Sequence, residues 1–211
     1  MTIERVFDGV GVLPVLTIHD ASIAVDLARA LLNGGLATIE VTLRTPEATR
    51  AIHDIRNALP EVIVGAGSVM NSTDSQSSVA AGASFLVSPG FDRDVVMSAE
   101  QDGVPYIPGV ATASEMQAAW NAGVRVMKVF PAEHIGGVRL IDSFAQVWPY
   151  ARFVPTGGIR HNNAEPYLAH PAVLAVGGSW MATPDDIARR DWARITDSAA
   201  AASALRKSDH G

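Results

Sequence analysis

Cysteine is absent from this 211-residue chain, and lysine is almost absent. Without cysteine there can be no disulfide bonds, thiolate metal sites or cysteine nucleophiles. Two lysines stand against fourteen arginines, and the formal net charge is −6, with no run of basic residues longer than a pair such as Arg189-Arg190. This balance argues against nucleic-acid binding. It does not exclude an anionic small molecule, because local dipoles and one or two arginines decide the potential inside a cleft.

Long apolar runs are also lacking, since none reaches the roughly 18 residues that a membrane span requires. The first residues, Met1 to Asp8, lack the basic start and apolar core of a secretory signal peptide. An apolar content of 48% and a charged content of 18% indicate a globular protein rather than a disordered one. We therefore expect a cytoplasmic protein without a membrane partner.

Short β-rich runs alternate along the chain with stretches of helical spacing, which predicts parallel βα units. Thr45, Thr112 and Thr183 are expected to cap three of the helices. The predicted strands are Val12–Leu16, Thr38–Thr42, Val62–Ala66, Phe85–Val87, Tyr106–Ile107, Arg125–Phe130, Arg152–Pro155 and Val173–Val176. Eight evenly spaced units without a linker predict a single (β/α)8 TIM barrel over residues 1–211. The alternative is a doubly wound open sheet, but no Gly-x-Gly-x-x-Gly turn follows the first strand.

Lys128 lies inside the apolar run Arg125–Phe130, whereas the other lysine, Lys207, is in the polar C-terminal tail. A lysine in such a strand loses water around its ammonium group, which favours the neutral amine. Neutral amines attack carbonyl groups to form Schiff bases. The alternative, from position alone, is a strand-end lysine whose ammonium group reaches solvent.

Glu40 shares one face of its predicted strand with Thr38, Thr42 and, if the extended geometry persists, Arg44. A carboxylate that points into a barrel is costly unless it is paired or functional. One interpretation is a structural salt bridge with Arg44 or Lys128. The other is a proton-shuttling group beside the amine, which Schiff-base chemistry requires at several steps.

Two glycine pairs follow the last two predicted strands, Gly157-Gly158 and Gly177-Gly178. Barrel enzymes frequently bind phosphate with backbone N–H groups of these two loops, and glycine lets the backbone approach an oxyanion closely. Either pair alone is explained equally well by a simple turn, but both pairs at both strand ends favour phosphate binding. Ser68 and Thr156, also near strand ends, can offer hydroxyl groups to a substrate. The six histidines are dispersed without metal-ligand spacing, so we expect no metal site.

Seven motifs, in order along essentially the whole chain, resemble the 2-keto-3-deoxy-6-phosphogluconate (KDPG) aldolase family. They are Glu-Val-Thr-Leu-Arg-Thr (40–45), Val-Gly-Ala-Gly-Ser-Val (64–69), Ser-Pro-Gly (88–90), Ile-Pro-Gly-Val (107–110), Lys-Val-Phe-Pro-Ala-Glu (128–133), Pro-Thr-Gly-Gly-Ile (155–159) and Gly-Gly-Ser-Trp (177–180). That family consists of class I aldolases on a (β/α)8 barrel, usually homotrimeric, that cleave the phosphorylated keto acid to pyruvate and glyceraldehyde 3-phosphate. Many members also act on 4-hydroxy-2-oxoglutarate.

The resemblance implies that Lys128 is the Schiff-base lysine and that Glu40 is the general acid/base. It implies that Arg44 and Ser68 contact the pyruvate carboxylate. It assigns the pocket walls to Pro89 and Phe130, and the phosphate loops to Gly157, Gly158, Gly178 and Ser179. Thr156 resembles the residue that contacts the C4 hydroxyl group. Sister galactonate enzymes tend to carry valine there, so threonine favours the gluconate epimer.

Such chemistry needs no metal or organic cofactor, because the lysine imine is itself the electron sink. Three alternatives stay open. An aldolase with another substrate, such as the phosphogalactonate epimer, would use the same residues. A sugar-phosphate isomerase or epimerase would use the same glycine loops, with Lys128 acting only electrostatically. A phosphosugar-binding protein without activity would use the loops alone.

Overall fold

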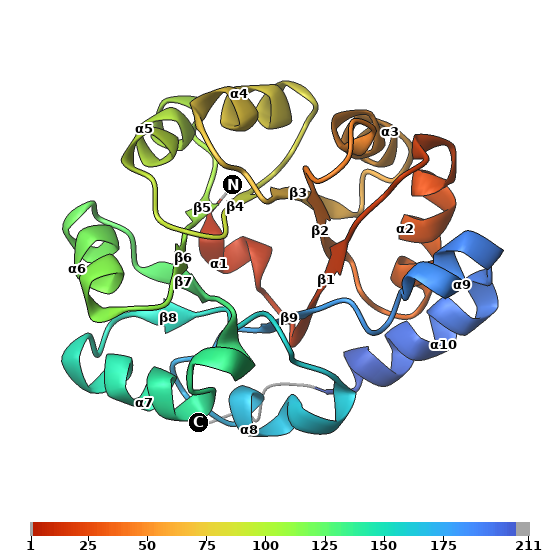
Figure 1. The fold of residues 1–211 in the computed structure, drawn as a ribbon. Helices are drawn as coiled ribbons and strands as arrows, with labels where there is room; N and C mark the ends of the chain where they lie inside the picture. Colours follow the sequence, from red (N-terminus) through yellow and green to blue (C-terminus); the bar gives the residue numbers. More distant parts are fainter. Residues whose placement is uncertain (1, 206–211) are drawn as a thin grey trace.

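The computed structural model describes residues 2–205, so Lys207 and His210 lie outside the described residues. Its strands pair in parallel in two sheets, ordered β5-β4-β3-β2-β1-β9 and β6-β7-β8 (Figure 1). The strands are β1 (Val12–Leu16), β2 (Thr38–Thr42), β3 (Ile63–Gly67), β4 (Leu86–Val87), β5 (Tyr106–Ile107), β6 (Gly109–Val110), β7 (Val126–Val129), β8 (Arg152–Phe153) and β9 (Val176–Gly178). Each predicted strand overlaps an observed one, although Val173–Val176 shares only Val176 with β9, and β6 was not among the predicted strands.

The two sheets are continuous at both of their ends, through the chain itself at one and through backbone hydrogen bonds at the other. β5 and β6 are separated only by Pro108, whose carbonyl oxygen accepts a hydrogen bond of 2.8 Å from the Lys128 N–H group. At the other junction, Gly177 donates to the carbonyl oxygen of Pro155 at 2.8 Å, and Gly177 also forms an isolated parallel bridge with Thr156. The sheets therefore curl around a common centre, with most helices on the outside (Figure 1).

The helices connect successive strands, and several begin at a capping side chain. They are α1 (Ile3–Val6), α2 (Ala24–Asn33), α3 (Ala48–Ala58), α4 (Ser72–Ala80), α5 (Arg93–Asp102), α6 (Ala113–Asn121), α7 (Val138–Val147), α8 (Glu165–Leu168), α9 (Pro184–Arg189) and α10 (Trp192–Ser203). Thr112 and Thr183 cap α6 and α9, as predicted. The expectation for Thr45 is wrong, because its hydroxyl group donates to the Ile18 carbonyl oxygen, while Glu47 takes the N-cap position of α3.

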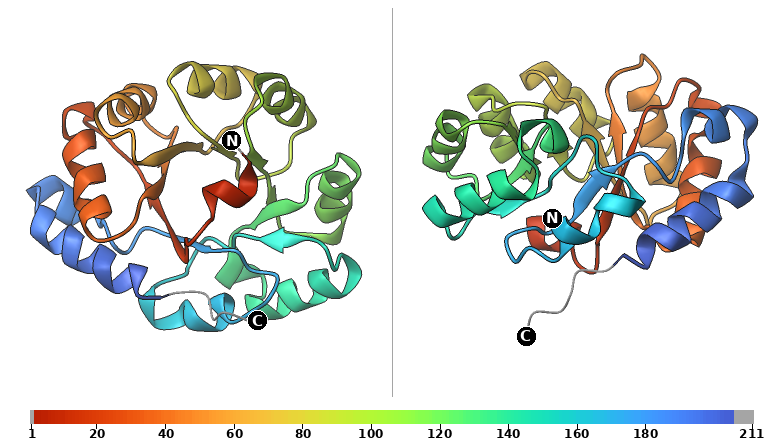
Figure 2. Two further views of the ribbon diagram at one scale, coloured as in Figure 1. Left: turned by 180° about the vertical axis from the view of Figure 1, so that it is seen from behind. Right: turned by 60° about the horizontal axis from the view of Figure 1, so that its bottom comes forward.

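Side-chain alternation along the strands separates two apolar cores. One lies between the sheets and the outer helices and includes Met127 and Val129 of β7. The other fills the interior of the ring and includes Val126 together with Phe85. Phe7, which follows α1, joins the inner core, and α1 lies across the centre of the ring (Figures 1 and 2). The amino ends of the strands are therefore covered.

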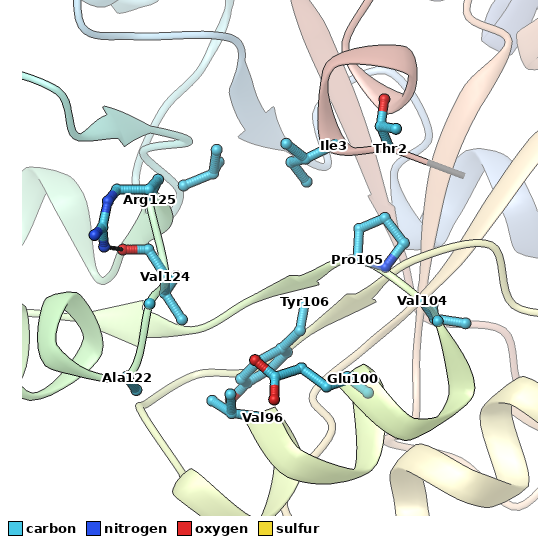
Figure 3. Close-up of a pocket in the computed structure, with 14 residues that line it drawn as sticks. Thr2, Ile3, Val96, Glu100, Val104, Pro105, Tyr106, Ala122, Val124 and Arg125 are labelled. Carbon is cyan, nitrogen blue, oxygen red and sulfur yellow. Dashed lines mark hydrogen bonds between the residues drawn. The ribbon is translucent and has the colours of Figure 1, made fainter.

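Two cavities of similar size lie at opposite ends of the strands. One, of about 480 Å³, is formed by residues that precede β5 and β7, with Val96 and Glu100 of α5 (Figure 3). Its lining is mostly apolar, and the Arg125 guanidinium there is already bonded to the carbonyl oxygens of Trp120 and Val124. The other cavity lies at the carboxyl ends.

Within residues 2–205, no helix has the length and hydropathy needed to cross a membrane.

Candidate active site

Lys128 and Glu40 point into the ring from opposite parts of the structure. Alternation on β7 puts Lys128 on the same face as Val126, whose side chain belongs to the inner core. The Lys128 Nζ atom lies 3.6 Å from Oε1 of Glu40, and the two side chains are 6% and 1% exposed. The snorkelling alternative for Lys128 is therefore wrong, because its ammonium group is buried beside a carboxylate.

The Glu40 carboxylate is buried without a hydrogen-bond partner in the described part of the chain. Leaving a carboxylate in this state is expensive, because desolvation is offset only by the neighbouring ammonium group. Arg44, the other partner considered from the sequence, bonds elsewhere. A carboxylate with unused oxygen atoms next to a buried amine is equipped to exchange protons with that amine or with a bound molecule.

Glycines of β3 make the space that Glu40 occupies. A methyl group built on Gly67 would overlap Oε1 of Glu40 and would lie 2.6 Å from its Cδ atom. A methyl group on Gly65 would likewise overlap the ring of Phe85 in the inner core. The sequence predicted Gly65 inside the strand Val62–Ala66 and both glycines within a family motif, but not why glycine is needed there. The two glycines are needed because two large side chains from neighbouring strands fill the same interior.

Phe130 and Pro89 flank Lys128 through different contacts. The Lys128 Nζ atom lies 5.1 Å from the centroid of the Phe130 ring. Gly109 is the direct partner of Lys128 in the β6–β7 register, and a side chain on Gly109 would overlap the Pro89 carbonyl group. Pro89 is therefore packed against the strand that neighbours Lys128.

Arg44 and Ser68 meet just beyond the carboxyl ends of β2 and β3. The Arg44 Nε group donates to the Ser68 hydroxyl oxygen at 3.2 Å. Ser68 adopts a φ of 57°, a left-handed conformation that is uncommon outside glycine. This arrangement brings a guanidinium and a hydroxyl group together, a pairing suited to a carboxylate.

The cavity at the carboxyl ends has a volume of about 500 Å³. Its lining includes most of the residues that the sequence analysis proposed for the substrate: Arg44, Phe130, Thr156, Gly157, Gly158, Gly178 and Ser179. The other predicted residues adjoin it indirectly. Ser68 is hydrogen-bonded to Arg44, and the Lys128 ammonium group lies over the Phe130 ring; both Arg44 and Phe130 line the cavity. Glu40 is one step further away, paired with Lys128. The structure thus gathers most of the predicted residues around one cavity, whereas Pro89 does not line it and packs against Gly109, the strand partner of Lys128.

In the loop that contains Gly157 and Gly158, carbonyl groups accept hydrogen bonds from the protein, whereas the two glycine N–H groups donate none among the described residues. The carbonyl oxygens of Thr156 and Gly157 accept from the N–H groups of Ala132 and Glu133 at 2.8 and 3.1 Å. Gly157 and Gly158 have φ values of 99° and 80°, which only glycine adopts without strain. Among residues 2–205, no acceptor takes a hydrogen bond from either glycine N–H group. Free N–H groups of this kind bind oxyanions.

Thr156 lies where the two glycine loops meet. Its side chain is buried, and a methyl group on Gly177 would overlap its hydroxyl oxygen. Gly178, the next residue, packs in the same way against the ring of Trp180. The second glycine pair therefore lets Thr156 and Trp180 approach the β9 backbone closely.

Tyr167 and Glu133 form a support for the Gly157-Gly158 loop that the sequence analysis missed. The buried Tyr167 hydroxyl group donates a short hydrogen bond to Oε1 of Glu133. Burial, together with this carboxylate, raises the pKa of Tyr167 above its ordinary value. A methyl group on Gly158 would lie 2.7 Å from the Glu133 Cβ atom. Glu133 ended a recognised motif, but nothing in the sequence pointed to Tyr167.

Arg190 was also missed as a site residue, although the basic pair Arg189-Arg190 stood out in the sequence. It lines the cavity beside Asp20 and His19, at the end of α9.

Across the described residues, no group of three or more histidine, aspartate or glutamate side chains could hold a metal ion.

Comparison with known proteins connects this geometry to a chemistry. Residues 3–198 match the family model described as "Aldolase: KDPG and KHG aldolase". The 2-dehydro-3-deoxy-phosphogluconate aldolase of Treponema pallidum is 46% identical over 93% of both chains.

Solved structures agree with this match along nearly the whole chain. KDPG aldolase of Legionella pneumophila, with pyruvate captured as a covalent carbinolamine intermediate, superposes with a TM-score of 0.93 at 38% identity. That alignment covers 96% of this chain and 98% of the other. The Zymomonas mobilis enzyme with 3-phosphoglycerate superposes with a TM-score of 0.90 at 41% identity, covering 98% and 97%.

Proposed function

The chain belongs to the KDPG and KHG aldolase family, and on this premise we propose that it is a class I aldolase. Its reaction is the cleavage of 2-keto-3-deoxy-6-phosphogluconate to pyruvate and glyceraldehyde 3-phosphate. One observation carries the proposal: a lysine and a glutamate, both buried, lie 3.6 Å apart beside a cavity with a guanidinium group and free backbone N–H groups. The covalent pyruvate adduct described for the Legionella relative supports the same chemistry.

In the first half-reaction, Glu40 takes a proton from the Lys128 ammonium group, and the neutral amine attacks the C2 ketone to form a carbinolamine. Glu40 gives a proton to the departing hydroxyl group, so water leaves and a protonated Schiff base remains. The Glu40 carboxylate, now free, accepts the proton of the C4 hydroxyl group. The C3–C4 bond then breaks, its electron pair moves toward the iminium nitrogen, and glyceraldehyde 3-phosphate leaves.

In the second half-reaction, the enamine on Lys128 takes a proton at C3 from Glu40 and becomes the pyruvate Schiff base. Water adds to C2 and gives a proton to the Glu40 carboxylate, the carbinolamine collapses, and pyruvate departs with the free amine restored. The 3.6 Å separation of Nζ and Oε1 suits these proton transfers, because one carboxylate must exchange protons with both the lysine nitrogen and the substrate bound to it. No step calls for a metal or an organic cofactor.

The remaining site residues have roles at the two ends of the substrate. Arg44 and Ser68 bind the carboxylate of the pyruvate half, while Pro89 and Phe130 wall the pocket. Gly157, Gly158, Gly178 and Ser179 bind the phosphate with backbone N–H groups. Thr156, between these ends, contacts the C4 hydroxyl group and favours the gluconate over the galactonate epimer. Action on 4-hydroxy-2-oxoglutarate is part of the proposal, because the matched family model includes both substrates.

The same proposal extends to the architecture. Counting β5 and β6 as one strand interrupted at Pro108, the two sheets form an eight-stranded (β/α)8 barrel. Residues 1–211 then make a single aldolase domain, cytoplasmic and assembled as a homotrimer. Sedimentation of the purified protein would test the trimer.

A phosphosugar isomerase would keep the phosphate loops but would not form an adduct with pyruvate. The deciding experiment is incubation with pyruvate, reduction with borohydride, and peptide mapping by mass spectrometry. We expect a pyruvyl group on Lys128 and time-dependent loss of activity. If folded protein saturated with pyruvate carries no adduct, the aldolase proposal is wrong.

A further inference from the structure

The cavity has a cationic side chain at each of two separate places. Among the residues that line it, the arginines are Arg44, which follows β2, and Arg190, which follows α9. α9 itself comes after the Gly178-Ser179 loop, and Pro184 and Ile187 of α9 line the same cavity. Arg190 therefore lines the same cavity as the two glycine loops, whereas Arg44 bonds to Ser68 beyond β3.

The Arg190 backbone is anchored, but its guanidinium group is not. Its φ of 53° closes the C-terminus of α9, where its N–H group donates to the Ile187 carbonyl oxygen at 3.0 Å. Its side chain is 62% exposed, and Nη2 lies 3.9 Å from Oδ2 of the exposed Asp20. Ion pairs with this separation and exposure contribute little to stability. The guanidinium group forms no hydrogen bond in the described part of the chain.

A charged donor binds a phosphate dianion more strongly than neutral N–H groups do, because charge-assisted hydrogen bonds are about twice as strong. The loops around Gly157 and Gly178 supply dipoles but no charged side chain. A guanidinium group at the cavity wall supplies that charge and can form two parallel hydrogen bonds to phosphate oxygens.

We propose that Arg190 binds the phosphate of the substrate and so sets the preference for phosphorylated over unphosphorylated keto acids. This inference rests on the proposed aldolase function. Asp20 is the resting partner of Arg190, and phosphate takes its place when substrate binds. Hydrogen bonds from Ser22, with a smaller contribution from Arg190, lower the pKa of Asp20, so this competitor stays charged.

The test compares kcat/KM for the phosphorylated keto acid with that for its unphosphorylated analogue, 2-keto-3-deoxygluconate. In Arg190→Gln the ratio of the two should fall about tenfold, the size expected for one charge-assisted hydrogen bond. Arg190→Lys should keep part of the ratio, because it retains the charge but loses the bidentate geometry. Glutamine and lysine both have unbranched side chains and must both adopt the left-handed conformation of residue 190, so the two variants should fold equally well.

Two further variants sharpen the result. Arg189→Gln removes the neighbouring arginine, which is exposed and does not line the cavity, so the ratio should stay unchanged. Asp20→Asn keeps a residue able to cap the turn at Ala21 but removes the competing charge, so the ratio should rise about twofold. Equal losses in Arg189→Gln and Arg190→Gln, or an unchanged ratio in Arg190→Gln, would overturn the proposal.

Binding of glycerol 3-phosphate, measured by calorimetry, separates this inference from the aldolase proposal. It needs no turnover, and affinity should fall about tenfold in Arg190→Gln but not in Arg189→Gln. If wild-type protein forms no pyruvate adduct yet shows this difference, the aldolase proposal fails and the role of Arg190 stands. Equal affinity in wild type and Arg190→Gln would overturn the role of Arg190 whatever the adduct experiment shows.

Discussion

The two ends of the cavity are built from different parts of the chain. At one end, reactive side chains of Lys128 and Glu40 are buried next to each other, at 6% and 1% exposure. At the other, Gly157 and Gly158 present backbone N–H groups, with the exposed Arg190 nearby. Bond making needs groups whose protonation is controlled by burial, whereas holding an anion needs donors in fixed directions.

Glycine serves both ends, but for different physical reasons. Gly67 has no positive φ and is needed only because Glu40 occupies the space of its side chain. Gly157 has a φ of 99°, so its backbone conformation itself requires glycine. One residue type thus makes room for a side chain at the first end and exposes the backbone at the second. Substitutions near Lys128 and Glu40 should therefore lower kcat, whereas substitutions near Gly157 and Gly158 should raise KM for the phosphorylated substrate.

The largest effect is expected for Lys128→Arg. A guanidinium group stays protonated, so it can pair with Glu40 but cannot form an imine. Turnover should fall to the uncatalysed rate, and the borohydride-trapped adduct should disappear while thermal unfolding stays cooperative. Measurable turnover in the purified variant would remove Lys128 from its proposed role.

Glu40→Gln should have the next largest effect, a loss of about 10² to 10⁴ in kcat, because it removes proton transfer but keeps the shape. Slow trapping of pyruvate on Lys128 should persist. Single-turnover kinetics with the phosphorylated substrate would measure this loss. A rate equal to that of the wild type would show that the carboxylate only balances the charge of Lys128.

Gly67→Ala tests whether space at the chemical end matters as much as charge. The new methyl group would overlap Oε1 of Glu40, so the carboxylate must move away from Lys128. A displacement of about 1 Å can lower kcat about 10²-fold. Gly90→Ala is the matched control, since a methyl group there meets nothing within 4 Å. Equal rates in the two variants would contradict the expected crowding.

Tyr167→Phe should have the smallest effect, and it should act at the phosphate end. Loss of the hydrogen bond to Glu133 should lower the free energy of unfolding by about 1 kcal/mol. Because Glu133 supports the loop under Gly158, KM for the phosphorylated substrate should rise severalfold while pyruvate trapping on Lys128 is unchanged. A fall in kcat with KM unchanged would instead connect Tyr167 to the chemical end.

Much of the fold followed from local patterns. The apolar run 125–130 singled out Lys128, alternation along 38–44 put Glu40 on one face with Thr38 and Thr42, and the strand bounds differed from the structure mainly at the last strand. The Thr45 cap failed because a distant carbonyl group, that of Ile18, competes for its hydroxyl group. Tyr167 was not predictable, because its only distinction is a contact with Glu133, which lies far away in the sequence.

By itself, the sequence determined which side chains face inward and which residues end the strands, because these depend on a period of two and on turn chemistry. It also carried the motifs that identify the family. Only the tertiary structure decided which inward residues meet. Closing the sheets brought Glu40 of β2 to Lys128 of β7, turned Arg44 toward Ser68, and placed Arg190 in the lining of the same cavity as the glycine loops. Periodicity assigns a face to each residue, but neighbours across a ring depend on how the strands curl and close.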